Sequence, residues 1–392
     1  MSALAVYVHI PFCTVKCGYC DFNAYAGMDN LKGAYGRALV REVVLDAPLF
    51  AGRTISSIGF GGGTPGEVPT ADIAAVIEAL GQSAPFAPDA EISLEANPGT
   101  TSGQALCELR RAGVTRISLG AQSFLADDLR FLDRIHSPEA TVAAVALARE
   151  AGFESVGLDL IYGLPGQTPE RFKHSLDAAV ALEPDHLSTY ALTVEDGTPL
   201  ARRVASGEVS VPDEDTVADL YDMASERLEA AGFEQYELSN WSKPGHQSRH
   251  NRTYWTDGDY LGLGAGAHGY VSGERHENIA HPRSYIAAVD AGETPLPALA
   301  NRYTPDRRTA ISDWLTTRMR LIEGFAPQEF EARFGATLDS TIGEVLADCR
   351  QAGVLDLEPR VRLTARGRLL HGEVSARFLA HLTRASGLGT RN

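Results

Sequence analysis

Short runs rich in β-branched and apolar residues alternate with longer stretches of helical spacing between residue 3 and about residue 240. This alternation constrains the fold most, because strands separated by helices pair in parallel and the helices cover the sheet. Six strand–helix units are fewer than the eight of a closed barrel, so we expect an α/β fold built as a partial barrel with an open side. The expected strands are Ala5–Ile10, Ile55–Phe60, Glu91–Ala96, Arg116–Gly120, Ser155–Ile161 and His186–Leu192.

The helices expected between these strands have clear ends. An Ala-Gly pair closes the helical pattern at 112–113, 151–152 and 231–232, and again at 352–353. Glycine just after a helix favours the left-handed turn that ends it, so we interpret the pair as a helix stop and not as an internal repeat. The expected helices are Leu31–Leu45, Thr70–Leu80, Gln104–Ala112, Pro138–Ala151 and Arg171–Leu182.

We expect three parts in the chain: the partial barrel in 1–240, a middle segment in 241–304 and a C-terminal domain in 305–392. The middle segment is rich in glycine, histidine and aromatic residues, and we expect loops that complete the barrel and form a binding segment or lid. Three helices followed by a short hairpin predict a winged-helix-like C-terminal domain. Its patterns lie at Asp306–Leu321, Pro327–Phe334, Leu338–Ala352 and, for the hairpin, Val354–Thr364.

The net charge of the chain limits the kinds of molecule that it can bind. The chain has 51 acidic and 35 basic residues, a formal net charge of −16, and no dense run of Lys or Arg. Such a surface repels phosphate backbones, so nucleic acid is excluded as the main partner. No run approaches the ~20 apolar residues of a membrane span, and the N-terminus lacks the pattern of a secretory signal. We therefore expect a cytoplasmic protein, for which peripheral contact with a membrane stays open.

Three of the five cysteines lie close together as Cys13, Cys17 and Cys20. The spacing C-x3-C-x2-C also fits one face of a helix, which would make it a buried stripe. Pro11 and Gly18 favour a loop instead, and this loop follows the first strand, at the end of a barrel where chemistry takes place. Three thiolates there can hold three corners of a [4Fe–4S] cluster and leave the fourth iron open, whereas structural zinc would need a fourth ligand from elsewhere in the chain.

The sequence around these cysteines, Tyr7-x-His9-Ile10-Pro11-Phe12-Cys13-x3-Cys17-x-Tyr19-Cys20-Asp21-Phe22, resembles the radical S-adenosylmethionine (SAM) superfamily. Within it, the sequence is similar to the branch that contains oxygen-independent coproporphyrinogen III oxidase and its haem-chaperone paralogue. The resemblance runs from the N-terminus to the C-terminal domain and implies a partial (β/α)6 TIM-like radical SAM barrel. It also implies chemistry in which the cluster reduces SAM by one electron, which yields methionine and a radical that abstracts hydrogen.

A glycine-rich turn, Gly61-Gly62-Gly63-Thr64-Pro65, follows the second expected strand. Without Cβ atoms its backbone can approach a ligand closely, although such a turn also serves simply to reverse the chain. In the resembling family this turn holds the amine of SAM, Glu95 bonds the ribose hydroxyls, and Tyr7 and Gly62 touch the bound SAM. The other residues that the resemblance places around SAM are Tyr19, Gly63, Thr64, Gln122, Arg134, Asp159 and Ala191.

The motif His250-Asn251-Arg252-Thr253-Tyr254-Trp255 matches the H-N-x-x-Y-W pattern that marks the haem chaperones of this branch. Imidazole is a common axial ligand of haem iron, and the rings of Tyr254 and Trp255 offer flat apolar surface to a porphyrin. Taken alone, the motif also fits a hydrogen-bonded loop histidine beside two core aromatics. The resemblance favours His250, Tyr254 and Trp255 as residues that contact haem.

Two departures from the oxidase pattern bear on the activity. Phe22 stands where the oxidase has a further cysteine, and the chain begins only a few residues before Tyr7, without the longer N-terminal arm of the oxidase. The resemblance therefore implies a haem-binding chaperone that passes haem to haem-requiring respiratory proteins, with productive cleavage of SAM left open. The alternative is an enzyme, a radical SAM oxidase that decarboxylates the propionates of coproporphyrinogen III. The sequence assigns no catalytic residue.

Overall fold

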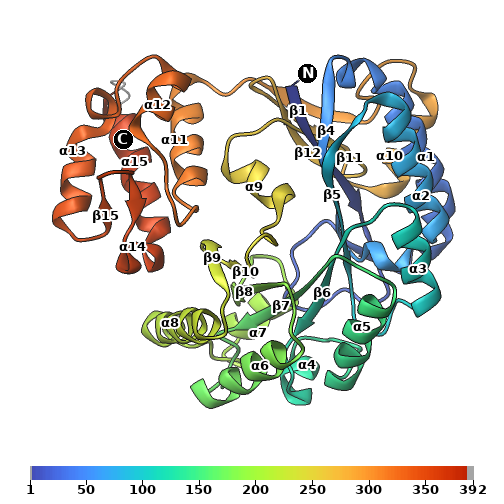
Figure 1. The fold of residues 1–392 in the computed structure, drawn as a ribbon, viewed down its shortest axis with the longest axis horizontal. Coiled ribbons are helices and arrows are strands. Elements are labelled where there is room, and N and C mark those ends of the chain that lie inside the picture. Colours follow the sequence, from blue (N-terminus) through green and yellow to red (C-terminus); the bar gives the residue numbers. More distant parts are fainter. Residues whose placement is uncertain (1, 386–392) are drawn as a thin grey trace. The chain divides into compact units, whose positions relative to one another are not determined.

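The computed structural model describes residues 2–385, and Figure 1 shows its ribbon. The chain forms two compact units. The first contains residues 2–234 together with Trp241–His250 and Asp259–Tyr303. The second contains Gln235–Asn240, Asn251–Gly258 and residues 304–385. Each unit has a buried apolar core of its own.

Six parallel strands form the centre of the first unit and confirm the expected partial barrel (Figure 1). They are neighbours in chain order, and each neighbouring pair runs parallel. Strand–helix–strand connections of one hand produce this order. The strands are β1 (Ser2–Ile10), β4 (Arg53–Gly62), β5 (Phe86–Ala96), β6 (Arg116–Gln122), β7 (Ser155–Tyr162) and β8 (His186–Ala191).

The expected helices begin and end within three residues of the expected positions: α1 (Lys32–Leu45), α2 (Thr70–Ser83), α3 (Gly103–Arg111), α5 (Pro138–Glu150) and α6 (Pro169–Ala181). The first unit also contains α4 (Ala126–Phe131), α7 (Pro199–Ala205) and α8 (Glu214–Ala230), which no expectation covered. Gly113, Gly152, Gly232 and Gly353 have φ angles of +104°, +81°, +78° and +71°. These left-handed conformations confirm that the Ala-Gly pairs end helices.

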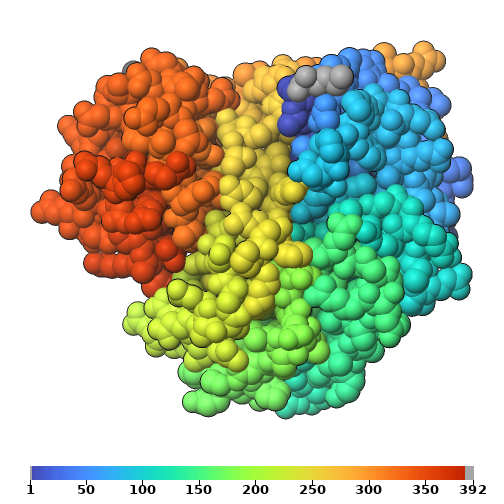
Figure 2. All heavy atoms as spheres, in the orientation of Figure 1, coloured from blue at the N-terminus to red at the C-terminus, as the bar shows by residue number. Residues whose placement is uncertain are grey.

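The two faces of the parallel sheet differ in chemistry, because side chains alternate along each strand. Val8 and Phe60 lie in register on the outer face, in the core under the helices. Figure 2 shows the surface atoms of this part of the chain in blue to green. Tyr7 and Gly59 lie in register on the inner face. The interior of the barrel is therefore lined by polar and small residues. The inner face also carries Ser57, Glu91, Ser93, Glu95, Arg116, Ser118, Asp159 and Ser188.

The expectation of loops in 241–304 is wrong, because this segment contains regular strands and helices. β11 (Tyr260–Leu263) pairs in parallel with β1, and β12 (His268–Val271), β13 (Glu274–Asn278) and β14 (Leu299–Tyr303) extend the sheet antiparallel. These strands are four or five residues long, which is too short for a periodic pattern to stand out in the sequence. The segment also contains the helices α9 (Arg249–Trp255) and α10 (Pro282–Ala291). At the opposite edge of the sheet, β8 is followed by β10 (Asn240–Ser242) and then β9 (Glu234–Glu237).

The second unit is mainly helical and includes the expected hairpin. Trp314, Phe325, Phe330 and Phe378 form the centre of its core, with Trp314 in edge contact with Phe325 and Phe330. Its elements from residue 304 onward are α11 (Arg307–Arg318), α12 (Pro327–Phe334), α13 (Leu338–Gln351), β15 (Leu355–Asp356), β16 (Arg362–Leu363), α14 (Ala365–Leu369) and α15 (His371–Ala385). This arrangement confirms a small, mainly helical C-terminal domain.

None of the helices within residues 2–385 combines the length and the apolar character that a bilayer span requires.

Candidate functional site

The three clustered cysteines lie on the loop that follows β1, at the carboxyl end of the barrel strands. Cys13 ends the two-residue strand β2 (Phe12–Cys13), which pairs with β3 (Tyr25–Ala26) across the base of the loop. The main-chain N–H of Cys20 donates to the carbonyl of Cys17 at 3.1 Å. All three cysteines are free and half-buried. Burial raises the pKa of the Cys13 and Cys20 thiols.

Two carboxylates from other parts of the barrel hold this loop. Oε2 of Glu67 accepts from the main-chain N–H of Thr14 at 2.7 Å and from its hydroxyl at 2.9 Å. On the other side of the loop, the N–H of Gly18 donates to Oδ2 of Asp133 at 3.0 Å. A Cβ at position 18 would lie 2.6 Å from that carboxylate oxygen, so a larger residue there would displace the Asp133 side chain. The loop is thus fixed at two points between its cysteines.

The three thiols have the chemistry that an iron–sulfur cluster requires. No group of three or more His, Cys, Asp or Glu side chains within residues 2–385 has the geometry to hold one metal ion. A [4Fe–4S] cluster binds each thiolate through a different iron, so its three cysteines need not converge on one point. The three half-buried thiols on one fixed loop fit that requirement.

The glycine-rich turn lies directly against the strand that leads to Cys13. The N–H of Gly63 donates to the carbonyl of Ile10, and the N–H of Thr64 to that of Phe12, both at 2.8 Å. A Cβ at Gly63 would lie 2.6 Å from the carbonyl oxygen of Phe12, and Gly62 has a φ of +113°. Only glycine permits this backbone path beside the cysteine loop.

Hydrogen bonds connect Cys13 to Cys17 through three polar side chains. Thr64 Oγ1 lies 3.5 Å from the sulfur of Cys13 and accepts from Nδ2 of Asn97 at 3.0 Å. Arg134 donates through Nη2 to Oδ1 of Asn97, and its Nη1 lies 3.8 Å from the sulfur of Cys17. We call Thr64, Asn97 and Arg134 the polar belt. Thr64 and Arg134, which are expected near SAM, therefore lie close to Cys13 and Cys17.

Glu95 and Asp159 are neighbouring acidic residues on the inner face of the barrel, where Glu95 is exposed and Asp159 is half-buried. Desolvation by the surrounding barrel and the neighbouring Asp159 raise the pKa of Glu95 to about 7. Burial likewise raises the pKa of Asp159, which accepts from the hydroxyl of Ser118 at 3.1 Å. Glu95 also approaches Gly61 and Tyr7, since a Cβ at Gly61 would lie within 3.3 Å of both side chains. A carboxylate here could accept hydrogen bonds from ligand hydroxyls.

His9 connects Tyr7 to the far end of the cysteine loop. Its Nε2 lies 2.9 Å from the carbonyl oxygen of Asn23, which can only accept, so Nε2 carries the proton. The hydroxyl of Tyr7 therefore donates to Nδ1 at 2.9 Å. Burial lowers the pKa of His9, in keeping with a neutral ring. His9 thus positions Tyr7 beside the barrel interior.

The remaining residues expected near SAM lie at the same end of the barrel. Gln122 has a φ of +63°, and its Oε1 is buried with no hydrogen-bond partner among residues 2–385. Its side chain and that of Arg134 both face Gly120, where a Cβ would lie within 3.0 Å of each. Tyr19 is half-buried, and Ala191 ends β8 in an exposed position. The orphaned amide oxygen of Gln122 could accept from a bound ligand.

His250 lies inside the first unit and is buried. Its Nδ1 shares a hydrogen bond of 3.1 Å with the hydroxyl of Ser57, and its ring stacks on that of Tyr7 with centroids 6.4 Å apart. The ring also fills the space beside Gly59, where a Cβ would lie 2.5 Å from Nε2. Burial lowers its pKa to about 4, so the ring is neutral. A haem iron would reach this imidazole only after the ring leaves that position.

Tyr254 and Trp255 belong to the second unit, although they share α9 with His250. Their rings meet edge to face with centroids 6.3 Å apart. The guanidinium of Arg320 lies over the ring of Trp255, 4.4 Å from its centroid, and also binds Glu237 at 2.7 Å. One face of Trp255 is therefore covered by a cation that has its own carboxylate partner.

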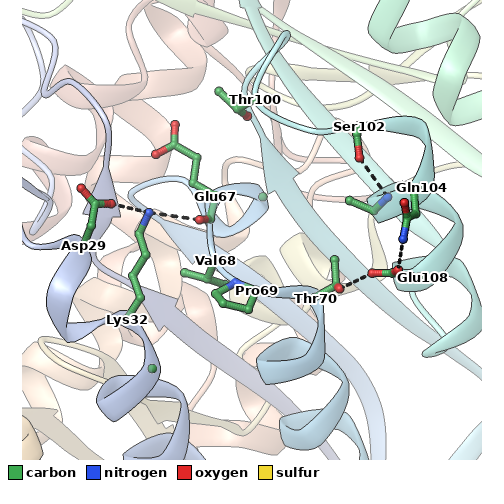
Figure 3. A pocket seen from close by; sticks show the side chains of 13 residues that line it. Asp29, Lys32, Glu67, Val68, Pro69, Thr70, Thr100, Ser102, Gln104 and Glu108 are labelled. Atoms are coloured by element: carbon green, nitrogen blue, oxygen red, sulfur yellow. Dashed lines mark hydrogen bonds and ion pairs between the residues drawn. The ribbon is translucent and has the colours of Figure 1, made fainter.

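A hollow of about 650 Å³ lies outside the barrel, beside the loops before α2 and α3. Figure 3 shows that Lys32 donates there to Asp29 and to the main-chain oxygen of Glu67. None of the residues expected to bind the cluster, SAM or haem lines it. Only Glu67 links the hollow to the cysteine loop.

Three residues of the site were not expected from the sequence: Glu67, Asn97 and Asp133. Asn97 lies two residues after Glu95, so the alternation of side chains could have placed it on the same face. No local signal marks Glu67 or Asp133, because their partners Thr14 and Gly18 are 53 and 115 residues away.

Comparison with known proteins agrees with this geometry. Residues 7–179 match the family model described as the radical SAM superfamily, and residues 306–370 match the HemN C-terminal domain. The chain is 43% identical to the heme chaperone HemW of Mycobacterium tuberculosis over 93% of this chain and 92% of the relative. It is 34% identical to the heme chaperone HemW of Bacillus subtilis over 96% of this chain and all of the relative. The solved structure of the radical SAM enzyme coproporphyrinogen III oxidase (HemN) from Escherichia coli matches with a TM-score of 0.82 and 28% identity, over 96% of this chain and 90% of that one.

Proposed function

Because this chain belongs to the heme chaperone HemW family, within the radical SAM superfamily, we propose that it is a haem-binding chaperone that carries a [4Fe–4S] cluster and SAM. The similarity over nearly the whole chain carries this proposal, since it extends through both the barrel and the C-terminal domain. In the proposed function the protein accepts haem and passes it to haem-requiring respiratory proteins. It works in the cytoplasm, with peripheral contact with the membrane where its acceptors require it.

Cys13, Cys17 and Cys20 would hold three irons of the cluster. Their free, half-buried thiols on a loop fixed by Glu67 and Asp133 support this assignment. The polar belt would donate hydrogen bonds to the sulfurs of Cys13 and Cys17, which stabilises negative charge there.

SAM would bind between the glycine-rich turn and the inner face of the barrel. The main chain of the glycine-rich turn would bind its amine, and the carboxylate of Glu95 would accept from its ribose hydroxyls. When bound together, the cluster and SAM supply one-electron chemistry. The protein orients the ligand and excludes water. The other residues proposed to line this region are Tyr7, Tyr19, Thr64, Gln122, Arg134, Asp159 and Ala191.

The cluster assignment is tested by anaerobic reconstitution of the full chain with iron and sulfide. We expect Cys17→Ser to lose most of its bound iron and sulfide, while Cys107→Ser, a half-buried cysteine of α3, keeps the amount found in the natural protein. Equal iron and sulfide contents in both variants would overturn the assignment.

Haem would be bound with contributions from His250, Tyr254 and Trp255. The motif supports this assignment, and the burial of His250 requires its ring to leave the barrel first. Titration with haem, followed by its absorbance, tests the chaperone: we expect saturable uptake by the natural protein and weaker uptake by His250→Ala. Failure of the natural protein to take up haem would overturn the proposed function.

A second candidate function is a radical SAM oxidase of coproporphyrinogen III. It is favoured by the TM-score of 0.82 with the solved structure of that enzyme and by the presence of Tyr7 and Glu95. Incubation of the reconstituted protein with coproporphyrinogen III, SAM and a reductant separates the two functions. Formation of protoporphyrinogen supports the oxidase, whereas stable haem uptake without that product supports the chaperone.

A further inference from the structure

Glu91 anchors the start of α9 inside the barrel. Its carboxylate accepts from the main-chain N–H of His250 at 3.1 Å, from that of Arg249 at 3.3 Å and from the hydroxyl of Ser248 at 3.2 Å. Arg116 donates to the same carboxylate at 3.0 Å, and both charged residues are buried. These four contacts use most of the acceptor capacity of one carboxylate.

Arg116 also binds the residues that directly precede α9. Its Nη2 donates to the carbonyl of His246 at 2.6 Å, two residues before Ser248. The segment from 246 to 250 is therefore held from both sides by one buried ion pair. Hydrogen bonds to an ionised acceptor are about twice as strong as neutral ones. The few hydrogen bonds to Glu91 therefore hold the start of α9 firmly.

Because His250 belongs to this segment, its imidazole is held in place as well. The ring is 4% exposed, hydrogen-bonded to Ser57 and packed on Gly59 and Tyr7. A haem iron needs one ring nitrogen of a histidine ligand. Neither nitrogen is accessible here, since Nδ1 faces Ser57 and Nε2 faces Gly59.

We propose that Glu91 is a positioning residue that, with Arg116, holds His250 in a closed state and sets how readily its imidazole becomes available to haem. This inference rests on the proposed function and describes how access of haem to His250 is regulated. In the closed state the start of α9 is bound to Glu91 and the ring fills the barrel. In the open state these hydrogen bonds break and the ring reaches the surface. Weakening the anchor raises the population of the open state.

Chemical modification of His250 in haem-free protein tests the closed state without any need for haem. The full chain is treated with diethyl pyrocarbonate, and the peptide that contains His250 is followed by mass spectrometry. We expect Glu91→Gln to increase the modification rate of His250 at least about tenfold, because the neutral amide binds the helix N–H groups more weakly. Asp89→Asn is the matched control, since Asp89 lies on the same strand and binds only the exposed side chain and not the main chain of Arg249.

Gly59→Ala tests the same closed state without touching the ion pair. Gly59 has ordinary extended backbone in β4, but a Cβ there would lie 2.5 Å from the His250 ring. The substitution should therefore displace the ring and raise its modification rate, even if Glu91→Gln fails to fold because Arg116 loses its partner. Modification of His250 at the rate of the natural protein in folded Gly59→Ala or folded Glu91→Gln would overturn the proposal.

Haem association provides the second readout. Glu91→Gln and Gly59→Ala should bind haem about tenfold faster than the natural protein, and adding His250→Ala to either should remove the gain. Equal rates in all of these proteins would overturn the proposal. If none of them, including the natural protein, binds haem, the proposed function fails, while the modification experiment still decides whether Glu91 holds the ring.

Discussion

The carboxylate of Glu67 accepts both the main-chain N–H and the hydroxyl of Thr14, at 2.7 and 2.9 Å. Thr14 directly follows Cys13, and Glu67 ends the short 3-10 helix Pro65–Glu67 that follows the glycine-rich turn. One carboxylate thus joins the two segments proposed to hold the cluster and SAM. Glu67 also lines the hollow in Figure 3, together with Glu108.

Glu67→Gln should weaken retention of the cluster. The amide removes the charge from two hydrogen bonds, and a hydrogen bond to a charged group contributes about 1 kcal/mol more than a neutral one. We expect a chelator to remove iron from reconstituted protein roughly fivefold to tenfold faster. Glu108→Gln is the control, since Glu108 lines the same hollow but accepts from Thr70 and Gln104. Equal rates of iron loss in the two variants would contradict the role of Glu67.

Asn97→Ala should weaken SAM binding. Without the amide, Thr64 and Arg134 lose the side chain that joins them, and the polar belt no longer fixes Arg134 beside Cys17. Loss of a part-buried hydrogen-bond partner costs about 1–3 kcal/mol, which corresponds to a dissociation constant roughly five to 150 times larger. Equilibrium dialysis with SAM measures this change. Asn301→Ala, at an exposed position of β14, should leave the constant unchanged.

Gly63→Ala should disrupt the glycine-rich turn. The new Cβ would lie 2.6 Å from the carbonyl oxygen of Phe12 and 2.9 Å from that of Ile10, and neither main-chain atom can move freely. Overpacking of this kind costs typically about 1–3 kcal/mol, so the denaturation midpoint should fall and SAM binding should be lost. In the control Gly372→Ala the new Cβ meets no atom within 4 Å. A Gly63→Ala protein with natural stability and SAM affinity would show that the turn is looser than described.

SAM binding should depend on pH through Glu95. Its pKa of about 7 leaves the carboxyl mostly protonated at pH 6 and mostly ionised at pH 8. The ionised form accepts ribose hydroxyls more strongly and attracts the cationic ligand, so we expect affinity to rise about tenfold over this range. Isothermal titration at several pH values measures the rise. Glu95→Gln should bind more weakly, with the rise absent, and a rise that persists would assign the titration to another group.

The same shift has a consequence for the stability of the SAM-free protein. Because desolvation by the surrounding barrel and the neighbouring Asp159 raise the pKa of Glu95 in the folded state, the folded state binds more protons than the unfolded state between the ordinary carboxyl pKa and about 7. Stability should therefore fall as pH rises through this window and level off above it. Chemical denaturation of the natural protein and of Glu95→Gln at matched pH values measures the contribution. A slope that is the same in both proteins would contradict it.

The barrel strands could be predicted from the sequence because their signal is local. Each strand alternates apolar residues for the outer core with polar or small residues for the interior, as in Val6, Val8 and Ile10 against Tyr7 and His9. The signal for the helix ends was equally local, since one glycine after each helix adopts a left-handed backbone conformation. The strands in 241–304 could not be predicted in this way, because β11 is held by pairing with β1, some 250 residues earlier in the chain.

The spacing of Cys13, Cys17 and Cys20, the glycine-rich turn and the motif at His250 were determined by the sequence alone, since each lies within a few consecutive residues. Only the tertiary structure decided that Glu67 and Asp133 hold the cysteine loop, that Asn97 joins Thr64 to Arg134, and that Glu91 anchors α9 with the imidazole of His250 inside the barrel. The physical reason is that a polar side chain acquires its role from the partner it meets. For these residues the partner comes from a distant part of the chain and is brought within reach only by the packing of the barrel.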